Sequence, residues 1–167
     1  MGLKEHIEVG LTAKCPSARV YRDIYLDSKR GKGAKADFLI LHKTGLYLVL
    51  TLNHACMVYG DEKADRWVLK YQDGQTEYFE NPVRTALDNA ALLDRKCRGM
   101  GQYVKPVILF CDEAHIVEMK VESNVAVETA DLFLSNMMVQ EYAKDIIPPA
   151  TRDQLAKQLQ LLEMLSK

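Results

Sequence analysis

The segment Leu46–Leu52 constrains the fold more than any other, because it is too apolar to face water on either side. Such a run is typical of a strand at the centre of a sheet whose two faces are both covered. The apolar run Phe38–Leu41 precedes it, and a turn from His42 to Gly45 separates the two. We therefore predict two consecutive strands here, the second of them central.

Other segments supply a first helix and further strands. Hydrophobic residues at helical spacing predict a helix over Leu3–Lys14, which Pro16 stops. Segments rich in β-branched and aromatic residues predict strands at Arg19–Leu26, Met57–Tyr59, Trp67–Tyr71, Thr76–Phe79 and Pro106–Cys111, with weaker candidates at Ile116–Val121 and Val125–Val127. The three short strands of residues 57–79 alternate with glycine turns, as in an antiparallel meander.

Three later helices complete the pattern. Asn81 can cap a helix that has proline as its first residue and ends near Arg98. A helix over Asp131–Lys144 follows, and a last one begins at Thr151, where Gln154 completes a capping-box pattern. The expected class is α/β, with a mixed central β-sheet flanked by helices.

Length, charge and cysteine usage narrow the classes of protein. The 167 residues fit a single domain, 1–167, and 48% hydrophobic residues suffice for a packed core. With a net charge of -1, any attraction to nucleic acid must come from a local cluster of cations. Four widely spaced cysteines without a CxxC pair favour a reduced, cytoplasmic protein. No membrane span or signal peptide is expected.

Two short matches to metal-dependent motifs are better explained as coincidences. Residues Asp112–His115 match the DEAH motif of nucleotide hydrolases. Such an enzyme also needs a phosphate-binding glycine loop, and Gly31–Lys35 lacks the spacing of that loop. No nucleotide ligand is therefore expected. Glu118 and Lys120 match E-x-K on a short, weakly apolar strand, where a solvated charge pair is the better interpretation. The histidines show no zinc-site spacing and are assigned structural or surface roles; they are His6, His42, His54 and His115.

The region from Asp37 to Arg84 resembles the nuclease-related domain (NERD) family. The family pattern is an Asp before an apolar strand, a Gly turn, a second strand ending in E-x-K-N, a Trp, and N-P-x-x-Q opening a helix. The matching residues here are Asp37, Gly45, Asn53, Trp67, Asn81 and Pro82. This resemblance implies the PD-(D/E)XK (restriction-endonuclease-like) nuclease fold.

In that fold an acidic pair holds a divalent metal ion, and a lysine orients or deprotonates the attacking water. Asp37 matches the first acid, but the Glu position falls at Leu50, the Lys position at Leu52 and the helix Gln position at Thr85. Positions 50 and 52 share one face of their strand, so the face that would hold the metal is hydrocarbon. No cofactor is therefore expected; if activity remains, Mg²⁺ is the ion and Asp37 its ligand. Otherwise Asp37 hydrogen-bonds backbone amides at a strand edge.

A basic segment lies just before Asp37 in the sequence. Its cations are Lys29, Arg30, Lys32 and Lys35. They enter the strand that carries Asp37, beside the place where a nuclease of this fold would meet a duplex, and they can contact phosphates. An ordinary solvated loop explains them equally well.

Three functions remain open. The chain is a catalytically inactive module, a pseudoenzyme that binds DNA, a protein partner or a second copy of itself. Alternatively, it is an active Mg²⁺-dependent DNA endonuclease in which His54, Asp61 or Glu62 replaces the missing groups. The third function is that of a structural subunit in a larger bacterial assembly, which a leucine-rich last helix favours.

Overall fold

The computed structural model describes residues 1–27 and 34–167. Its helices are α1 (Leu3–Lys14), α2 (Pro82–Lys96), α3 (Ala130–Gln140) and α4 (Pro149–Leu165), with a 3-10 turn at Gly101–Tyr103. Its strands are β1 (Arg19–Tyr25), β2 (Lys35–His42), β3 (Gly45–Leu52), β4 (Met57–Asp61), β5 (Arg66–Lys70), β6 (Thr76–Glu80), β7 (Val104–Phe110), β8 (His115–Lys120) and β9 (Ala126–Thr129). The predicted α/β class is confirmed.

β3 lies at the centre of the larger sheet, whose strand order is β1-β2-β3-β7-β9. β1, β2 and β3 run antiparallel, whereas β3, β7 and β9 run parallel, so the sheet is mixed. The first five residues of β3 are all buried, because this strand has a neighbour on each side and covered faces. The central position predicted for Leu46–Leu52 is confirmed.

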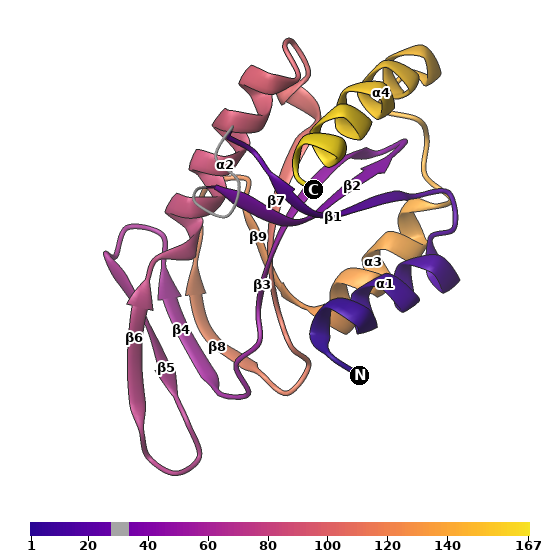
Figure 1. Ribbon diagram of the computed structural model, residues 1–167. Helices are drawn as coiled ribbons and strands as arrows, with labels where there is room; N and C mark the ends of the chain where they lie inside the picture. The colour runs from indigo at the N-terminus through magenta and orange to yellow at the C-terminus, as the bar shows by residue number, and fades with distance from the viewer. Residues whose placement is uncertain (28–33) are drawn as a thin grey trace.

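A second, smaller sheet has the order β6-β5-β4-β8 and lies at the lower left of Figure 1, below α2. β4, β5 and β6 form the predicted antiparallel meander. β8 joins β4 in parallel, so the chain leaves the larger sheet after β7 and returns to it as β9. The sequence predicted these strands but not their division between two sheets.

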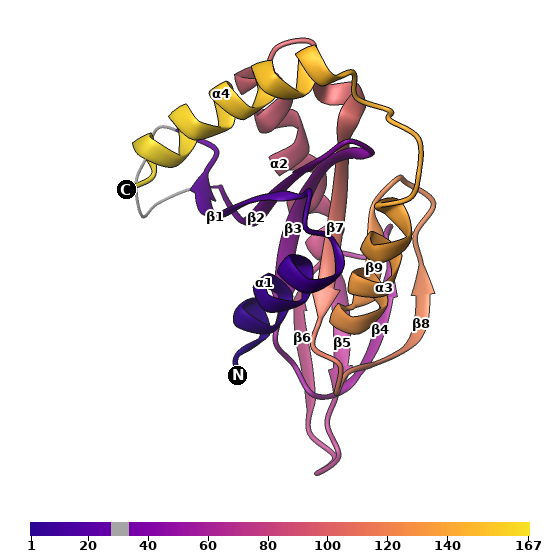
Figure 2. The same ribbon diagram turned by 90° about the vertical axis from the view of Figure 1, so that its right-hand side faces the viewer.

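Helices cover both faces of the larger sheet (Figures 1 and 2). One buried cluster joins α1 and α3 to Phe38 and Val49, and another joins α2 and α4 to Leu39 and Leu48. Adjacent strand residues therefore alternate between the two faces, as the pleat requires. A third cluster, around Trp67, fills the space between α2 and the smaller sheet.

Helix ends show where the sequence patterns held and where they failed. Asn81 caps α2 as predicted, since its side chain accepts a hydrogen bond of 3.0 Å from the amide of Val83. The capping box at Thr151 is wrong, because α4 already begins at Pro149 and has no side-chain cap. Proline suits this position because the first turn of a helix needs no donor from it. In the described ranges no helix is long and apolar enough to cross a membrane.

Candidate functional site

Asp37, the acid predicted from the sequence, lies at an irregularity between β1 and β2. Asp23 and Asp37 stand opposite each other but form no regular pair, although the pairs on either side are intact. Those flanking pairs are Arg22 with Phe38 and Ile24 with Ala36. Asp23 has a φ of 55°, a left-handed conformation that is uncommon for residues other than glycine. The regular pairing of β1 with β2 is therefore interrupted at Asp23 and Asp37.

The Asp37 carboxylate is hydrogen-bonded on both oxygens. Its Oδ2 accepts from the backbone amide of Thr51 at 2.8 Å and from the Thr51 hydroxyl at 3.0 Å. Its Oδ1 lies 3.0 Å from the Nζ of Lys4, and the side chain is 18% exposed. These donors hold the carboxylate against β3 and the first turn of α1.

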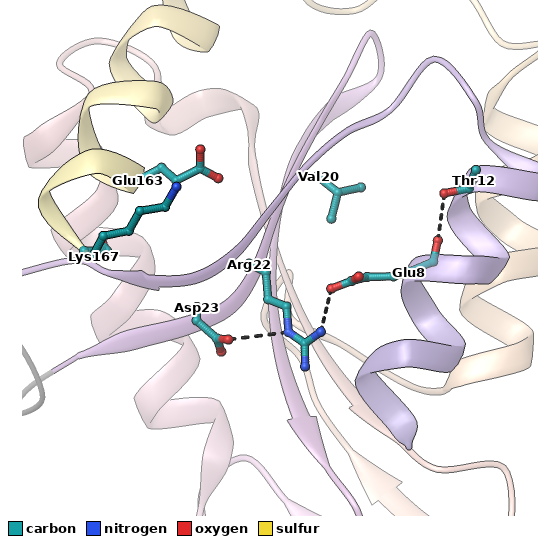
Figure 3. Close-up of a pocket in the computed structure, with 8 residues that line it drawn as sticks. Glu8, Thr12, Val20, Arg22, Asp23, Glu163 and Lys167 are labelled. Carbon is teal, nitrogen blue, oxygen red and sulfur yellow. Dashed lines mark hydrogen bonds and ion pairs between the residues drawn. The ribbon is translucent and has the colours of Figure 1, made fainter. Parts of the chain in front are cut away.

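Asp23 extends this arrangement into a network of charges. Its carboxylate lies 2.9 Å from Nζ of Lys4, 3.1 Å from Nζ of Lys35 and 3.4 Å from Nε of Arg22. Burial raises the pKa of Asp23, but hydrogen bonds from the two lysines outweigh it, so the pKa lies below its ordinary value. Figure 3 shows Arg22 between the carboxylates of Asp23 and Glu8, beside a hollow of about 410 Å³. Positive and negative groups balance here, which leaves little net charge to attract a metal ion.

The side chains of Leu50 and Leu52 lie on the face of β3 opposite to the Asp37 carboxylate. Both are partly buried and pack against the cluster around Trp67, between α2 and the smaller sheet. Thr51, which binds Asp37, points to the opposite face of β3 because side chains alternate along a strand. The sequence placed Asp37 and the two leucines at one site, whereas the structure directs the carboxylate to the other face of β3.

The remaining residues considered for catalysis do not gather around Asp37. Thr85 is exposed on α2. His54 lies 3.1 Å from the hydroxyl of Tyr71, and Asp61 accepts a hydrogen bond from the amide of Lys63. Glu62 accepts bonds from the backbone amides of residues 122 and 123. The hydrogen bonds described for these three groups join them to residues other than Asp37.

The predicted phosphate-binding segment is described only in part. Lys29, Arg30 and Lys32 lie outside the described residues. Lys35 begins β2, and its ammonium group is paired with Asp23. Glu118 and Lys120, which match E-x-K, form the solvated pair that the sequence predicted. Nζ of Lys120 lies 3.5 Å from Oε1 of Glu118, and the two side chains are 68% and 59% exposed.

Two groups of potential metal ligands occur elsewhere in residues 1–27 and 34–167, and Asp37 belongs to neither. One of them is exposed: Nε2 of His6 lies 2.7 Å from Asp131 and 3.3 Å from Asp112. The hydrogen bond from His6 lowers the pKa of Asp131. A hollow of about 280 Å³ adjoins this group, lined also by Asn53 at the end of β3.

The second group is buried and joins Cys15, His42 and Glu141. Burial raises the pKa of the Cys15 thiol to about 12 and lowers that of His42. Burial also raises the pKa of Glu141, but hydrogen bonds from Ser17, Cys15 and His42 outweigh it and bring the value to about 2. Neither group was predicted from the sequence, because their members are far apart in the chain and only the packing of α1 against α3 unites them.

Comparison with known proteins gives one match. The family model of the nuclease-related domain matches residues 5–111, from α1 to the residue after β7. This range includes Asp37, Leu50, Leu52 and Asn81. No curated protein and no solved structure matches the chain.

Proposed function

Because the chain belongs to the nuclease-related domain family, we propose that it binds nucleic acid without cleaving it. The observation that carries this proposal is the use of Asp37 as a structural group. Its carboxylate is bound by Thr51 and Lys4, while Leu50 and Leu52 pack into an apolar cluster on the opposite face of β3.

Cleavage of the PD-(D/E)XK type needs two acidic ligands for a divalent ion and a lysine near the attacking water. In our proposed assignment the second acid and the lysine are replaced by Leu50 and Leu52. Mg²⁺ keeps several waters and is usually bound through one or two carboxylates. Hydrocarbon side chains offer no ligand, and Asp37 already carries an ammonium partner at 3.0 Å. The residues therefore do not fit a catalytic magnesium ion.

Binding requires less than cleavage. The four cations at positions 29, 30, 32 and 35 immediately precede Asp37 in the sequence. Phosphate contacts by such residues depend on local charge, so a net charge of -1 for the whole chain does not prevent them. Lys35 shares Asp23 with Lys4, so we expect the segment before it to supply most of the affinity.

Titration of the purified chain with labelled duplex and single-stranded DNA at low salt, with Mg²⁺ present, tests binding and cleavage together. We expect a salt-dependent complex and intact DNA. Removal of one phosphate-binding cation should reduce the slope of log K against log salt by about 0.9 for duplex DNA. The variant and its control each remove three cations: Lys29→Ala/Arg30→Ala/Lys32→Ala against Arg95→Ala/Lys96→Ala/Arg98→Ala.

The two triple variants change net charge equally, but the control residues lie exposed at the end of α2 and just beyond it. We expect only the first variant to bind roughly tenfold or more weakly, with a slope that is smaller by up to about 2.7. If both variants bind DNA equally weakly, the binding depends on the overall charge of the protein and not on the segment before Asp37. Absence of any complex would refute the proposal and direct the search to protein partners.

Metal-dependent cleavage would contradict the proposed loss of catalysis. The exposed group of His6, Asp112 and Asp131 would then be the first centre to test, since it offers an imidazole and two carboxylates within 4.8 Å. Asp112→Asn would abolish cleavage at that centre, whereas Asp37→Ala would abolish it at the rearranged family site. The two variants thus separate the possible locations.

A further inference from the structure

The buried group of Cys15, His42 and Glu141 lies where three elements end. Cys15 directly follows α1, His42 is the last residue of β2, and Glu141 directly follows α3. α1 and α3 lie side by side against the larger sheet, as Figures 1 and 2 both show. Their neighbouring C-terminal ends bring together side chains that are 126 residues apart in the sequence.

The polar atoms of this group converge on one carboxylate oxygen. Oε1 of Glu141 lies 3.1 Å from Sγ of Cys15 and 2.9 Å from Nε2 of His42, and it also accepts from the hydroxyl of Ser17. The His42 side chain is fully buried and Glu141 is 17% exposed. A thiol, an imidazole and a carboxylate thus share a small volume largely screened from water.

Both ring nitrogens of His42 have hydrogen-bond partners, which fix the position of the imidazole. Its Nδ1 lies 2.8 Å from the Thr44 hydroxyl, which lies 2.9 Å from the hydroxyl of Tyr47. In this structure Nδ1 also accepts a hydrogen bond from the backbone amide of Thr44 at 3.3 Å, and Nε2 donates to Glu141. A metal ion on Nε2 requires the ring proton to move to Nδ1, where the Thr44 hydroxyl can accept it. Such an outer hydrogen bond commonly fixes the tautomer and ring position of a ligating histidine.

The donor set matches zinc in kind and in charge. Zinc takes thiolate, imidazole and carboxylate ligands at roughly 2.0–2.3 Å, which places tetrahedral neighbours about 3.4–3.6 Å apart. The sulfur–oxygen and nitrogen–oxygen separations of 3.1 and 2.9 Å would have to open by about half an ångström. A thiolate and a carboxylate together would balance the two charges of the ion.

The surroundings also provide access. A hollow of about 190 Å³ adjoins the group at His42 and has room for a water as fourth ligand. Its charged lining residues are Arg19, Lys43, Arg152 and Asp153. The three cations oppose a metal ion. Nζ of Lys43 donates to the backbone oxygen of Glu141 at 2.7 Å, and Arg152 is paired with the carboxylate of Asp145 at 2.9 Å. The charge of Arg152 is therefore balanced by a carboxylate, whereas the hydrogen bond of Lys43 leaves its charge in place, because a backbone carbonyl is neutral.

We propose that Cys15, His42 and Glu141 form a binding site for a zinc-class divalent transition-metal ion. The ion replaces the thiol proton, which is released to solvent, and the hydrogen bonds to Glu141, while the ring proton of His42 moves from Nε2 to Nδ1. It links the ends of α1, β2 and α3. The site is separate from Asp37 and from the proposed nucleic-acid contact, so each proposal can fail without the other.

Titration of the chelator-treated full chain with Co²⁺, a spectroscopic substitute for Zn²⁺, tests the site directly. We expect one equivalent to produce a thiolate-to-cobalt charge-transfer band and the visible bands of four-coordinate cobalt, both removed by Zn²⁺. Cys15→Ser should abolish the charge-transfer band and Glu141→Gln should weaken binding at least tenfold. Cys97→Ser is the matched control, because Cys97 is equally buried but packs in a different cluster.

Thermal unfolding with and without Zn²⁺ gives a second measurement that does not rely on the cobalt bands. The ion should raise the midpoint of the wild-type chain and of Cys97→Ser but not that of Glu141→Gln. A wild-type chain without a charge-transfer band overturns the proposal, as does a band that persists in Cys15→Ser. If Cys15→Ser does not fold, the wild-type spectrum and the Glu141→Gln comparison still decide the question.

Discussion

Asn81→Ala is expected to destabilise the protein strongly, because this side chain joins the start of α2 to the smaller sheet. It is 2% exposed, and its oxygen accepts from the amide of Val83 at 3.0 Å. Its Nδ2 donates to three backbone oxygens, at 3.3, 2.7 and 2.8 Å, which belong to Asp61, Glu62 and Ala64. The helix cap and the turn after β4 therefore depend on one amide group.

The expected loss of stability follows from these hydrogen bonds. Removing an N-cap acceptor costs about 0.5–2 kcal/mol. The two Nδ2 protons form the equivalent of about two net hydrogen bonds, worth roughly 0.5–1.5 kcal/mol each. Water can reach the three carbonyls in part, so we expect a total loss of about 2–4 kcal/mol. For a chain of this length that corresponds to a midpoint lowered by roughly 4–16 °C.

Denaturant and thermal unfolding, followed by circular dichroism, measure this loss of stability. Asn81→Asp keeps the cap acceptor but points a carboxylate at the carbonyls, so it should be at least as destabilising as alanine. Asn89→Ala is the matched control, since Asn89 is equally buried on α2 but makes one long bond of 3.5 Å to the oxygen of Lys35. A loss below about 0.5 kcal/mol for Asn81→Ala, or a stable Asn81→Asp variant, would refute this account of the junction.

Three further outcomes are expected. Thr51→Val, which removes the 3.0 Å bond from the hydroxyl to Asp37 but keeps the amide bond, should lower the free energy of unfolding by about 1–2 kcal/mol in urea titrations. Burial raises the pKa of Asp23, but hydrogen bonds from Lys4 and Lys35 outweigh it and hold the pKa below its ordinary value of 3.8. The stabilisation of the fold by this carboxylate is therefore present above that pH and lost as the pH falls through the lowered pKa. Asp23→Asn should therefore flatten the dependence of stability on pH below about 4, and an unchanged acid slope would contradict this network. Gly60→Ala places a methyl group 2.7 Å from the ring of Trp67 and should cost about 1–3 kcal/mol, measured by the fluorescence of this single tryptophan.

Most of the fold was predictable because its signals are local. The apolar run Leu46–Leu52 defined the central strand, and Asn81 defined the start of α2 through a contact with the next turn. The division of the strands between two sheets was not predictable, because it depends on β8 pairing with β4 rather than with β7. That pairing joins segments more than fifty residues apart, and both are short and partly exposed. The start of α4 was misplaced because a proline at the first position outweighed the capping pattern at Thr151.

The candidate site was predictable only in part. Strand alternation correctly places Leu50 and Leu52 on the same face, apart from Thr51. The same alternation would direct Asp37 towards Leu50, and this fails where the regular pairing of β1 with β2 is interrupted at Asp23. A strand-like sequence does not indicate that one of its residues adopts the left-handed conformation. The metal-ligand groups were missed for another reason, since each depends on the packing of α1 against α3.

The positions that keep the family pattern differ in kind from those that lose it. Asn81 supports the junction between α2 and the smaller sheet, and Trp67 is fully buried at the centre of a cluster. Asp37 also has a structural role, since it binds a β3 amide and the ammonium group of α1. In our proposed assignment, Leu50 and Leu52 occupy two positions where catalysis, but not folding, requires a polar side chain. Both leucines pack against the buried cluster around Trp67. Under the proposed function this distribution is expected, because binding needs the fold alone, whereas cleavage also needs charged groups at the catalytic positions.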